Sequence, residues 1–200
     1  MSSYPIDSTN WRYGLSMPEF IESMGQHQQA MRSRYSRIRL SPVECEGFTR
    51  LKKRISIAVM TEEWCTDCLM NLPVIARIAD AASQMELKIF IRKDWPDLRA
   101  YYTEQNIPSI PVATFLDENF EVLSTWIERP QAAHRRLQAW KAAHPEVEEI
   151  RRRSDLTSEE KKLLLKEINE RLLVEMESWY DNGLQSETIG EVADLLGVKL

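Results

Sequence analysis

Two cysteines three residues apart, placed where an apolar run gives way to a helical pattern, constrain the fold of this chain more than any other feature. Residues 64–68 read Trp-Cys-Thr-Asp-Cys. The apolar run at 55–60 predicts a buried strand, and apolar residues at helical spacing over 69–82 predict a helix. The sequence therefore predicts a dithiol at a strand-to-helix junction.

The spacing of Cys65 and Cys68 suits a disulfide that opens and closes. Residues at i and i+3 lie on one helical turn, close enough for their sulfurs to bond. A helix that begins near Cys65 brings unpaired N–H groups and the positive end of the helix dipole to that sulfur, which favours its thiolate. We therefore predict Cys65 as the nucleophile and Cys68, more buried, as the resolving thiol, with no cofactor besides their disulfide.

The segments after the dithiol predict an α/β fold. A second strand at 87–91 precedes a helical stretch from Asp97 and a proline-led strand at 107–116. A polar turn then leads to a return strand at 120–127, and a closing helix runs from Pro130 to about His144. The order is strand, helix, strand, helix, and then an antiparallel hairpin with a final helix.

Three features together resemble the thioredoxin family: the Trp-Cys-Thr-Asp-Cys motif at 64–68, Pro73 in the following helix, and Ile110-Pro111 at the start of a strand. The resemblance implies a thioredoxin-like three-layer α/β/α sandwich with a mixed central sheet. The predicted domains are a helical extension at 1–53, the thioredoxin-like domain at 54–145, and a helical extension at 146–200 that packs on the core.

The resemblance also implies roles for individual residues. Pro73 has the structural role of kinking the redox helix, as a proline inside a helix does on physical grounds. Pro111 is implied to be a cis-proline facing the dithiol, and the Ile110 backbone to pair with substrate. Trp64, Ile110 and Pro111 are therefore the predicted substrate-binding residues.

Two positions depart from the family pattern. Val59 stands where thioredoxins carry a buried acid, so Glu63 and Asp67 become the candidates for proton transfer through water. Glu128 stands where a glycine borders the substrate groove. We therefore expect the groove to differ in shape and charge from that of other family members.

The motif variant is similar to those of small cytosolic thioredoxin-related reductases, and the acidic residues Glu62, Glu63 and Asp67 disfavour a thiolate beside them. We therefore predict a cytoplasmic thiol–disulfide oxidoreductase that reduces disulfides in cell redox homeostasis. Its substrates would be disulfide-containing proteins or small thiols, and a thioredoxin reductase or a low-molecular-weight thiol would supply electrons. The alternative is a protein-interaction or redox-sensing adaptor without general turnover.

Composition and charge argue against binding to nucleic acid, membranes or metal ions. The 200 residues carry a net charge of −5, which does not attract nucleic acid or anionic membranes. The chain begins without a signal-peptide pattern and has no apolar run of membrane-spanning length, so we expect a cytoplasmic location. Cys45 and the three histidines lack the spacing of zinc ligands, so no metal is predicted.

The two ends of the chain predict helices. One runs from about Pro18 to Tyr35 and is followed by arginines that we interpret as a solvated face. Another begins at a capping box, Thr157 to Glu160, and ends at Asn182-Gly183. Its apolar stripe predicts packing on the core, on the N-terminal helix or on another subunit, so the protein is expected to be a monomer or a homodimer. The stripe consists of Leu164, Ile168, Leu172, Met176 and Trp179. A small helix at 187–198 completes the chain.

Overall fold

A computed structural model describes residues 3–200, so Met1 and Ser2, the start of the predicted N-terminal extension, lie outside the described residues. The chain forms two compact units. The first comprises the residues up to Arg129 together with Thr188–Leu200, and the second is Pro130–Glu187. Both cysteines of the motif and the sheet belong to the first unit.

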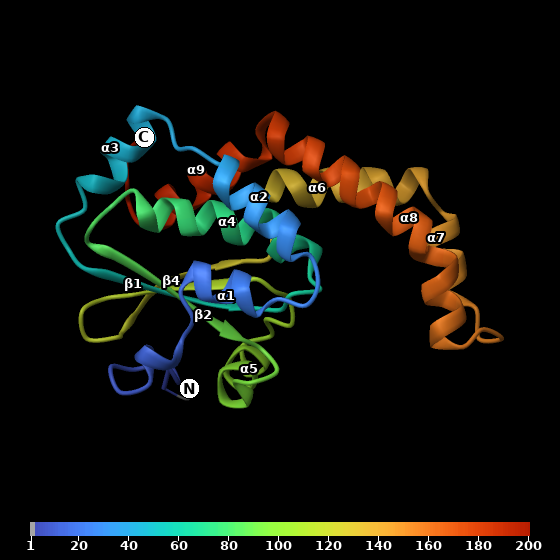
Figure 1. Cartoon of the computed structure of the whole chain (residues 1–200), viewed down its shortest axis with the longest axis horizontal. Coiled ribbons are helices and arrows are strands. Elements are labelled where there is room, and N and C mark those ends of the chain that lie inside the picture. Colours follow the sequence, from blue (N-terminus) through green and yellow to red (C-terminus); the bar gives the residue numbers. More distant parts are fainter. Residues whose placement is uncertain (1–2) are drawn as a thin grey trace. The chain divides into compact units, whose positions relative to one another are not determined.

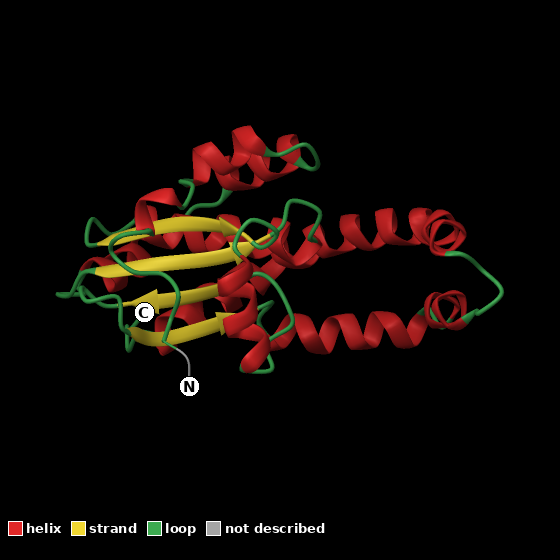
Figure 2. Ribbon diagram, turned by 90° about the horizontal axis from the view of Figure 1, so that it is seen from below, coloured by secondary structure: helices red, strands yellow, loops and turns green. Residues whose placement is uncertain are grey.

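The first unit is built around a four-stranded sheet (Figure 2). Its strands are β1 (Ile55–Thr61), β2 (Met85–Ile91), β3 (Val112–Leu116) and β4 (Val122–Ile127), in the order β2-β1-β3-β4. β1 pairs in parallel with β2, whereas β3 is antiparallel to both β1 and β4. The mixed sheet and its hairpin confirm the predicted α/β fold class.

Helices cover both faces of this sheet. In Figure 1, α4 (Thr66–Asp80) and α2 (Gln28–Arg37) lie on one side of the sheet, and α5 (Pro96–Glu104) lies on the other. Every residue of β1 is buried, as expected for a strand with neighbours on both edges and helices on both faces. This layering is the predicted thioredoxin-like α/β/α sandwich.

An apolar core on the α5 side of the sheet includes both cysteines of the motif. Alternate residues of β1 point into it, because successive side chains of a strand face opposite sides. Its buried members are Ile6, Trp11, Ala58, Met60, Cys65, Cys68, Phe90, Leu98, Tyr102, Ile110, Val112 and Leu116. The dithiol therefore lies against apolar side chains, where water does not solvate a charge well.

The segment before α1 is part of this core. Ile6 and Trp11 are buried in it, and Trp11 lies within a short 3-10 helix, Trp11–Tyr13. Leu15 then pairs with Ile89 of β2 through two backbone hydrogen bonds of 2.9 and 2.7 Å. The N-terminal region therefore completes the sheet's packing as well as supplying helices.

The prediction of one helix from Pro18 to Tyr35 is wrong, because the chain forms two helices there. α1 (Met17–Ser23) ends before Met24, whose backbone is extended (φ −72°, ψ 130°). α2 begins after His27, which lies in the left-handed region (φ 57°). Gly25 stands between them, and glycine is among the weakest helix formers. The helical spacing of the apolar residues does not reveal this break.

The C-terminal segment of the first unit begins inside α9 (Gln185–Leu195). The Thr188 hydroxyl donates a 2.9 Å hydrogen bond to the side-chain oxygen of Asn71 in α4, and both side chains are fully buried. Gly47 in α3 (Pro42–Thr49) lies so close to the chain end that a Cβ there would be 2.9 Å from the Leu200 side chain. The last residues are thus packed on the helices of this unit.

The second unit consists of helices. They are α6 (Gln131–Ala143), α7 (Glu146–Arg152), α8 (Ser158–Trp179) and the π-helical turn η2 (Tyr180–Leu184). The capping box of Thr157 and Glu160 is present, and the helical backbone is interrupted at Asn182 and Gly183, where Gly183 has a φ of 132°. Both predicted ends of the long C-terminal helix are confirmed.

The apolar face of α8 is rotated slightly from the predicted stripe. Leu165 and Ile168 pack with Trp140 and Val147 in a small core. Leu164, which we assigned to the stripe, is 48% exposed. The buried face follows a spacing of three from Leu165 to Ile168, which the adjacent leucines did not allow us to distinguish.

The compact units are divided differently from the predicted domains. The second unit begins with α6, which we assigned to the thioredoxin-like domain at 54–145. The first unit includes Thr188–Leu200, which we assigned to the C-terminal extension. Whether 54–145 folds as a domain by itself stays a prediction.

Gly14→Ala is expected to destabilise the first unit. A Cβ on Gly14 would lie 2.7 Å from Cζ of Phe90 and 2.8 Å from Cβ of Lys88. Either the N-terminal segment or β2 would have to move, so we expect a loss of about 1–3 kcal/mol in the free energy of unfolding. Urea denaturation followed by circular dichroism measures this loss.

Gly190→Ala is the matched control. Gly190 lies inside α9, and among residues 3–200 no atom beyond the adjoining helix backbone lies within 4 Å of a Cβ at this position. Replacing a helical glycine by alanine is expected to leave stability unchanged or to raise it by up to about 1 kcal/mol. Equal stability of the two variants would contradict the close packing inferred at Gly14.

Candidate active site

Cys65 is the N-cap residue of α4, so the helix begins where the sequence predicts. Its backbone is extended (φ −81°, ψ 118°), and its sulfur accepts a 3.1 Å hydrogen bond from the N–H of Cys68. The N–H groups in the first turn of a helix have no partner inside the helix. One of them therefore serves the predicted nucleophile, in the arrangement that stabilises a thiolate.

Cys68 lies deeper in the core than Cys65. Its side chain is fully buried, whereas Cys65 is 6% exposed. Burial, and then the neighbouring Cys65 thiol, raise the pKa of the Cys68 thiol well above its ordinary value. Cys68 is therefore protonated in the reduced protein at neutral pH, which fits the predicted order of attack.

The predicted substrate-binding residues surround Cys65. The Ile110–Pro111 peptide bond is cis, as the resemblance implies. The Cys65 thiol donates a 3.5 Å hydrogen bond to the carbonyl oxygen of Ile110. Trp64 is 56% exposed, although it adjoins a buried cysteine. An exposed aromatic ring and a proline loop thus flank the nucleophile.

An ion pair fixes the Asp67 side chain in the first turn of α4. Its carboxylate accepts two hydrogen bonds from the Arg129 guanidinium, of which the one from Nε measures 2.8 Å. Both side chains are largely buried, at 14% and 13% exposure. The Nη2 atom of Arg129 also donates to Glu128, at 2.8 Å. The charge of Asp67 is therefore offset by a cation.

The residues around this ion pair connect α4 to the end of β4. Glu128 has a φ of 65°, the left-handed conformation that favours glycine, and its N–H donates a 2.7 Å hydrogen bond to the Pro111 carbonyl. The Asn71 side chain donates to the carbonyls of Asp67 (3.1 Å) and Glu128 (3.2 Å). The proline loop and the redox helix are thus held by one hydrogen-bonded network.

The other two carboxylates beside the motif also have partners. Glu62 is nearly buried and accepts a 2.9 Å hydrogen bond from the N–H of Lys93. Glu63 accepts hydrogen bonds from the N–H groups of Gly25 (2.5 Å) and Gln26 (3.2 Å), which hold the turn between α1 and α2. Proton transfer by Glu63 or Asp67 stays a prediction, and both would have to act from these bonded positions.

Two kinds of feature are absent from the described part of the chain. Over residues 3–200, no group of three or more His, Cys, Asp and Glu side chains is arranged to hold a metal ion. Nor does any helix within that range combine the length and apolar character needed to cross a membrane.

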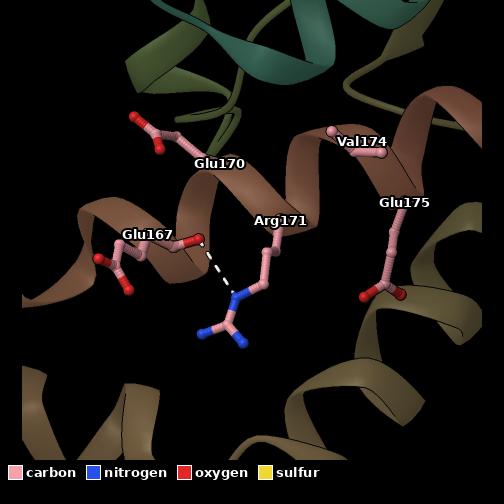
Figure 3. A pocket seen from close by; sticks show the side chains of 5 residues that line it. All are labelled: Glu167, Glu170, Arg171, Val174 and Glu175. Carbon is pink, nitrogen blue, oxygen red and sulfur yellow. Dashed lines mark hydrogen bonds between the residues drawn. The ribbon is translucent and has the colours of Figure 1, made fainter.

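A shallow pocket in the second unit lies on α8 (Figure 3). Its lining residues are Glu167, Glu170, Arg171, Val174 and Glu175. Arg171 donates a 3.4 Å hydrogen bond from Nε to the Glu167 carbonyl. The lining of this pocket contains no cysteine, histidine or hydroxyl side chain.

The sequence matches the thioredoxin family model over residues 14–141. This match spans more than half of the chain and includes the motif, the cis-proline and Arg129. The chain therefore belongs to the thioredoxin family. Membership in this family and the dithiol at the end of β1 indicate a redox-related function.

Two solved structures resemble nearly the whole chain. A protein of unknown function from Pseudomonas aeruginosa gives a TM-score of 0.64, and an HIV epitope scaffold gives 0.63. Each is 21% identical in sequence, and each likeness covers 98% of both chains. At this identity the likeness shows the fold alone, and it includes the terminal helices. No curated protein matches the sequence.

Sequence reasoning did not identify Arg129 or Asn71 as parts of this site. Arg129 follows the return strand, far from Asp67 in the chain, and nothing in the sequence pairs the two charges. Asn71 was hidden within an apolar helical pattern.

Loss of Arg129 is expected to destabilise the protein. Arg129→Ala leaves the largely buried Asp67 carboxylate without its cation, which costs about 3 kcal/mol of unfolding free energy. Adding Asp67→Asn removes the unpaired charge, so the double variant should be more stable than Arg129→Ala alone. A double-mutant cycle of urea-unfolding energies measures the coupling.

Arg32→Ala is the control for an exposed ion pair. Arg32 pairs with Glu22 at 2.8 Å, but the two side chains are 53% and 69% exposed. Its loss is expected to cost less than about 1 kcal/mol. If the Arg129 and Arg32 variants were equally stable, the buried pair would not have the importance inferred here.

Proposed function

We propose that this protein is a thiol–disulfide oxidoreductase that works as a disulfide reductase through Cys65 and Cys68. One observation carries the proposal: the sulfur of Cys65 caps α4, accepts the Cys68 N–H, and contacts the Ile110 carbonyl beside the cis-proline. A protein that used this fold only as a binding scaffold would not need a thiol in that position.

The proposed reaction transfers two electrons from the dithiol to a substrate disulfide. The Cys65 thiolate attacks one sulfur of the substrate, forms a mixed disulfide, and releases the other substrate sulfur as a thiolate. Cys68 then attacks the Cys65 sulfur, which forms the Cys65–Cys68 disulfide and releases the second substrate thiol. A thioredoxin reductase or a low-molecular-weight thiol returns the protein to the dithiol state.

Substrate recognition in this proposal uses the residues around Cys65. The exposed Trp64 ring offers an apolar contact, and the Ile110 backbone beside Pro111 pairs with an extended segment of the substrate. Glu63 and Asp67 are the carboxylates proposed to pass protons through water. The substrates are disulfide-containing proteins or small disulfides, and the proposed setting is redox homeostasis in the cytoplasm.

The proposed reduction potential is toward the reducing end of the family range, more negative than about −200 mV. The acidic residues near the dithiol support this value, although Asp67 contributes less than its charge suggests because Arg129 offsets it. A redox titration of the Cys65–Cys68 pair measures the potential, and a value near −120 mV, typical of strong oxidants, would contradict the proposal.

Exposed apolar side chains on α8 support the alternative, a protein-interaction or redox-sensing adaptor. Leu163 is 73% exposed and Val174 is 67% exposed. Such side chains are found where a helix contacts another protein, including a second copy of the same chain. After both cysteines of the motif were replaced, a protein-interaction adaptor would bind its partner equally well, and a redox-sensing adaptor would lose the response of this binding to oxidation. The proposed reductase would lose its activity.

Cys65→Ser is expected to reduce disulfide reduction to the background rate, because the attacking thiolate is lost. Cys68→Ser should still attack substrates but leave them bound as mixed disulfides. Insulin reduction regenerated by dithiothreitol measures turnover, and non-reducing gels show trapped species. Cys45→Ser is the control and should keep full activity, since Cys45 lies outside the motif. Full turnover by Cys65→Ser would exclude the proposed mechanism.

A further inference from the structure

Thr61 carries a buried hydroxyl whose surroundings are unusual for this protein. It is the last residue of β1, and its side chain is fully buried. The hydroxyl forms no hydrogen bond of ordinary geometry with any residue from 3 to 200. An unpaired polar group in a core costs free energy, so native proteins rarely keep one without a reason.

The other two fully buried threonines behave differently. The hydroxyl of Thr114 bonds to those of Tyr102 (2.7 Å) and Thr125 (3.3 Å). Thr188 donates to Asn71 at 2.9 Å. All three threonines have no exposed surface, but Thr61 alone among them has no such partner. Its hydroxyl is therefore available to donate a hydrogen bond to a neighbouring group when that group becomes negatively charged.

Cys68 is close enough to the Thr61 hydroxyl for this hydroxyl to influence its ionisation. Burial and the Cys65 thiol raise the pKa of Cys68, whereas the nearby Thr61 hydroxyl and the backbone of Glu62 lower it. Both Thr61 and Cys68 are fully buried. A hydroxyl hydrogen rotates freely, so it can turn toward the sulfur when negative charge develops there.

The carboxylates near the motif are committed to other partners. Glu62 is bonded to the N–H of Lys93, and Glu63 to the N–H groups of the turn after α1. Asp67 is paired with Arg129. A carboxylate that assists Cys68 would have to give up one of these contacts, whereas the Thr61 hydroxyl would give up none of comparable geometry.

We propose that Thr61 is a positioning residue for the resolving step, and that its hydroxyl donates a hydrogen bond to the Cys68 sulfur as this sulfur attacks the mixed disulfide. The inference rests on the proposed function of the dithiol. In this step the S–H bond of Cys68 and the Cys65–substrate S–S bond break, and the Cys65–Cys68 S–S bond forms. The Cys68 proton goes to water or to the leaving substrate thiolate, and Thr61 keeps its own proton.

Reaction of the reduced protein with the aromatic disulfide DTNB separates the two steps. Attack by Cys65 releases one thionitrobenzoate and leaves the other bound in a mixed disulfide. Attack by Cys68 then releases the second and closes the protein disulfide. Both releases are followed by absorbance in a stopped-flow instrument, and Cys45→Ser is used as the common background so that the third thiol does not contribute.

Thr61→Val is the main test, because valine has nearly the volume of threonine without the hydroxyl. We expect the first release to keep its rate and the second to slow by about tenfold, the effect of losing one hydrogen bond to a charged group. The pH dependence of the second release should also move to higher pH. Thr61→Ser, which keeps the hydroxyl, should restore the second rate and its pH dependence to within about threefold of the parent.

The outcomes distinguish the inference from the function beneath it. A folded Thr61→Val variant that releases the second thionitrobenzoate at the parent rate would overturn the role of Thr61 and leave the reductase proposal intact. Equal slowing of both releases in both Thr61 variants would indicate a packing defect and would also overturn that role. A parent protein that releases only one thionitrobenzoate would overturn the reductase proposal and the role of Thr61 together.

Discussion

The burial of β1 between β2 and β3 determines the geometry of the candidate site. Every residue of this strand is buried, and both of its edges are hydrogen-bonded. Its last residue, Thr61, is therefore fixed in the core, and the short link 62–64 delivers Cys65 directly to the N-cap of α4. This placement gives the two cysteines different environments. Cys65 lies at the N-terminal end of α4, whereas Cys68 lies one turn further along the helix and is fully buried.

Features that depend on neighbouring residues in the chain could be predicted from the sequence. Local sequence patterns predict the buried strand β1, the hairpin of β3 and β4, and the start of the helix at Cys65. The break between α1 and α2 could not be predicted, because the carboxylate of Glu63, distant in sequence, holds the turn. Arg129 was missed for the same reason. Its role depends on the ion pair with Asp67, and the two residues come together only in the folded chain.

The charge around the dithiol illustrates how far composition can mislead. Glu62, Glu63 and Asp67 suggest a strongly negative environment when they are counted along the sequence. In the folded protein, Asp67 faces a guanidinium, and Glu62 and Glu63 accept backbone N–H groups. The electrostatic potential at a cysteine sulfur depends on such pairings and on burial more than on the number of nearby acidic residues. The remaining negative charge acts through Glu62 and Glu63.

A hydroxyl suits the resolving thiol better than a carboxylate in this particular core. A carboxylate on β1 would be charged, and burying it without a cation would cost far more than burying a hydroxyl. The apolar side chain of Val59 avoids that cost, and the strand stays neutral as far as Thr61. The hydroxyl is most useful when Cys68 carries negative charge, which happens only during attack on the mixed disulfide. It thus favours the charged sulfur with little stabilisation of the resting thiol, which is what a group that accelerates the step must do.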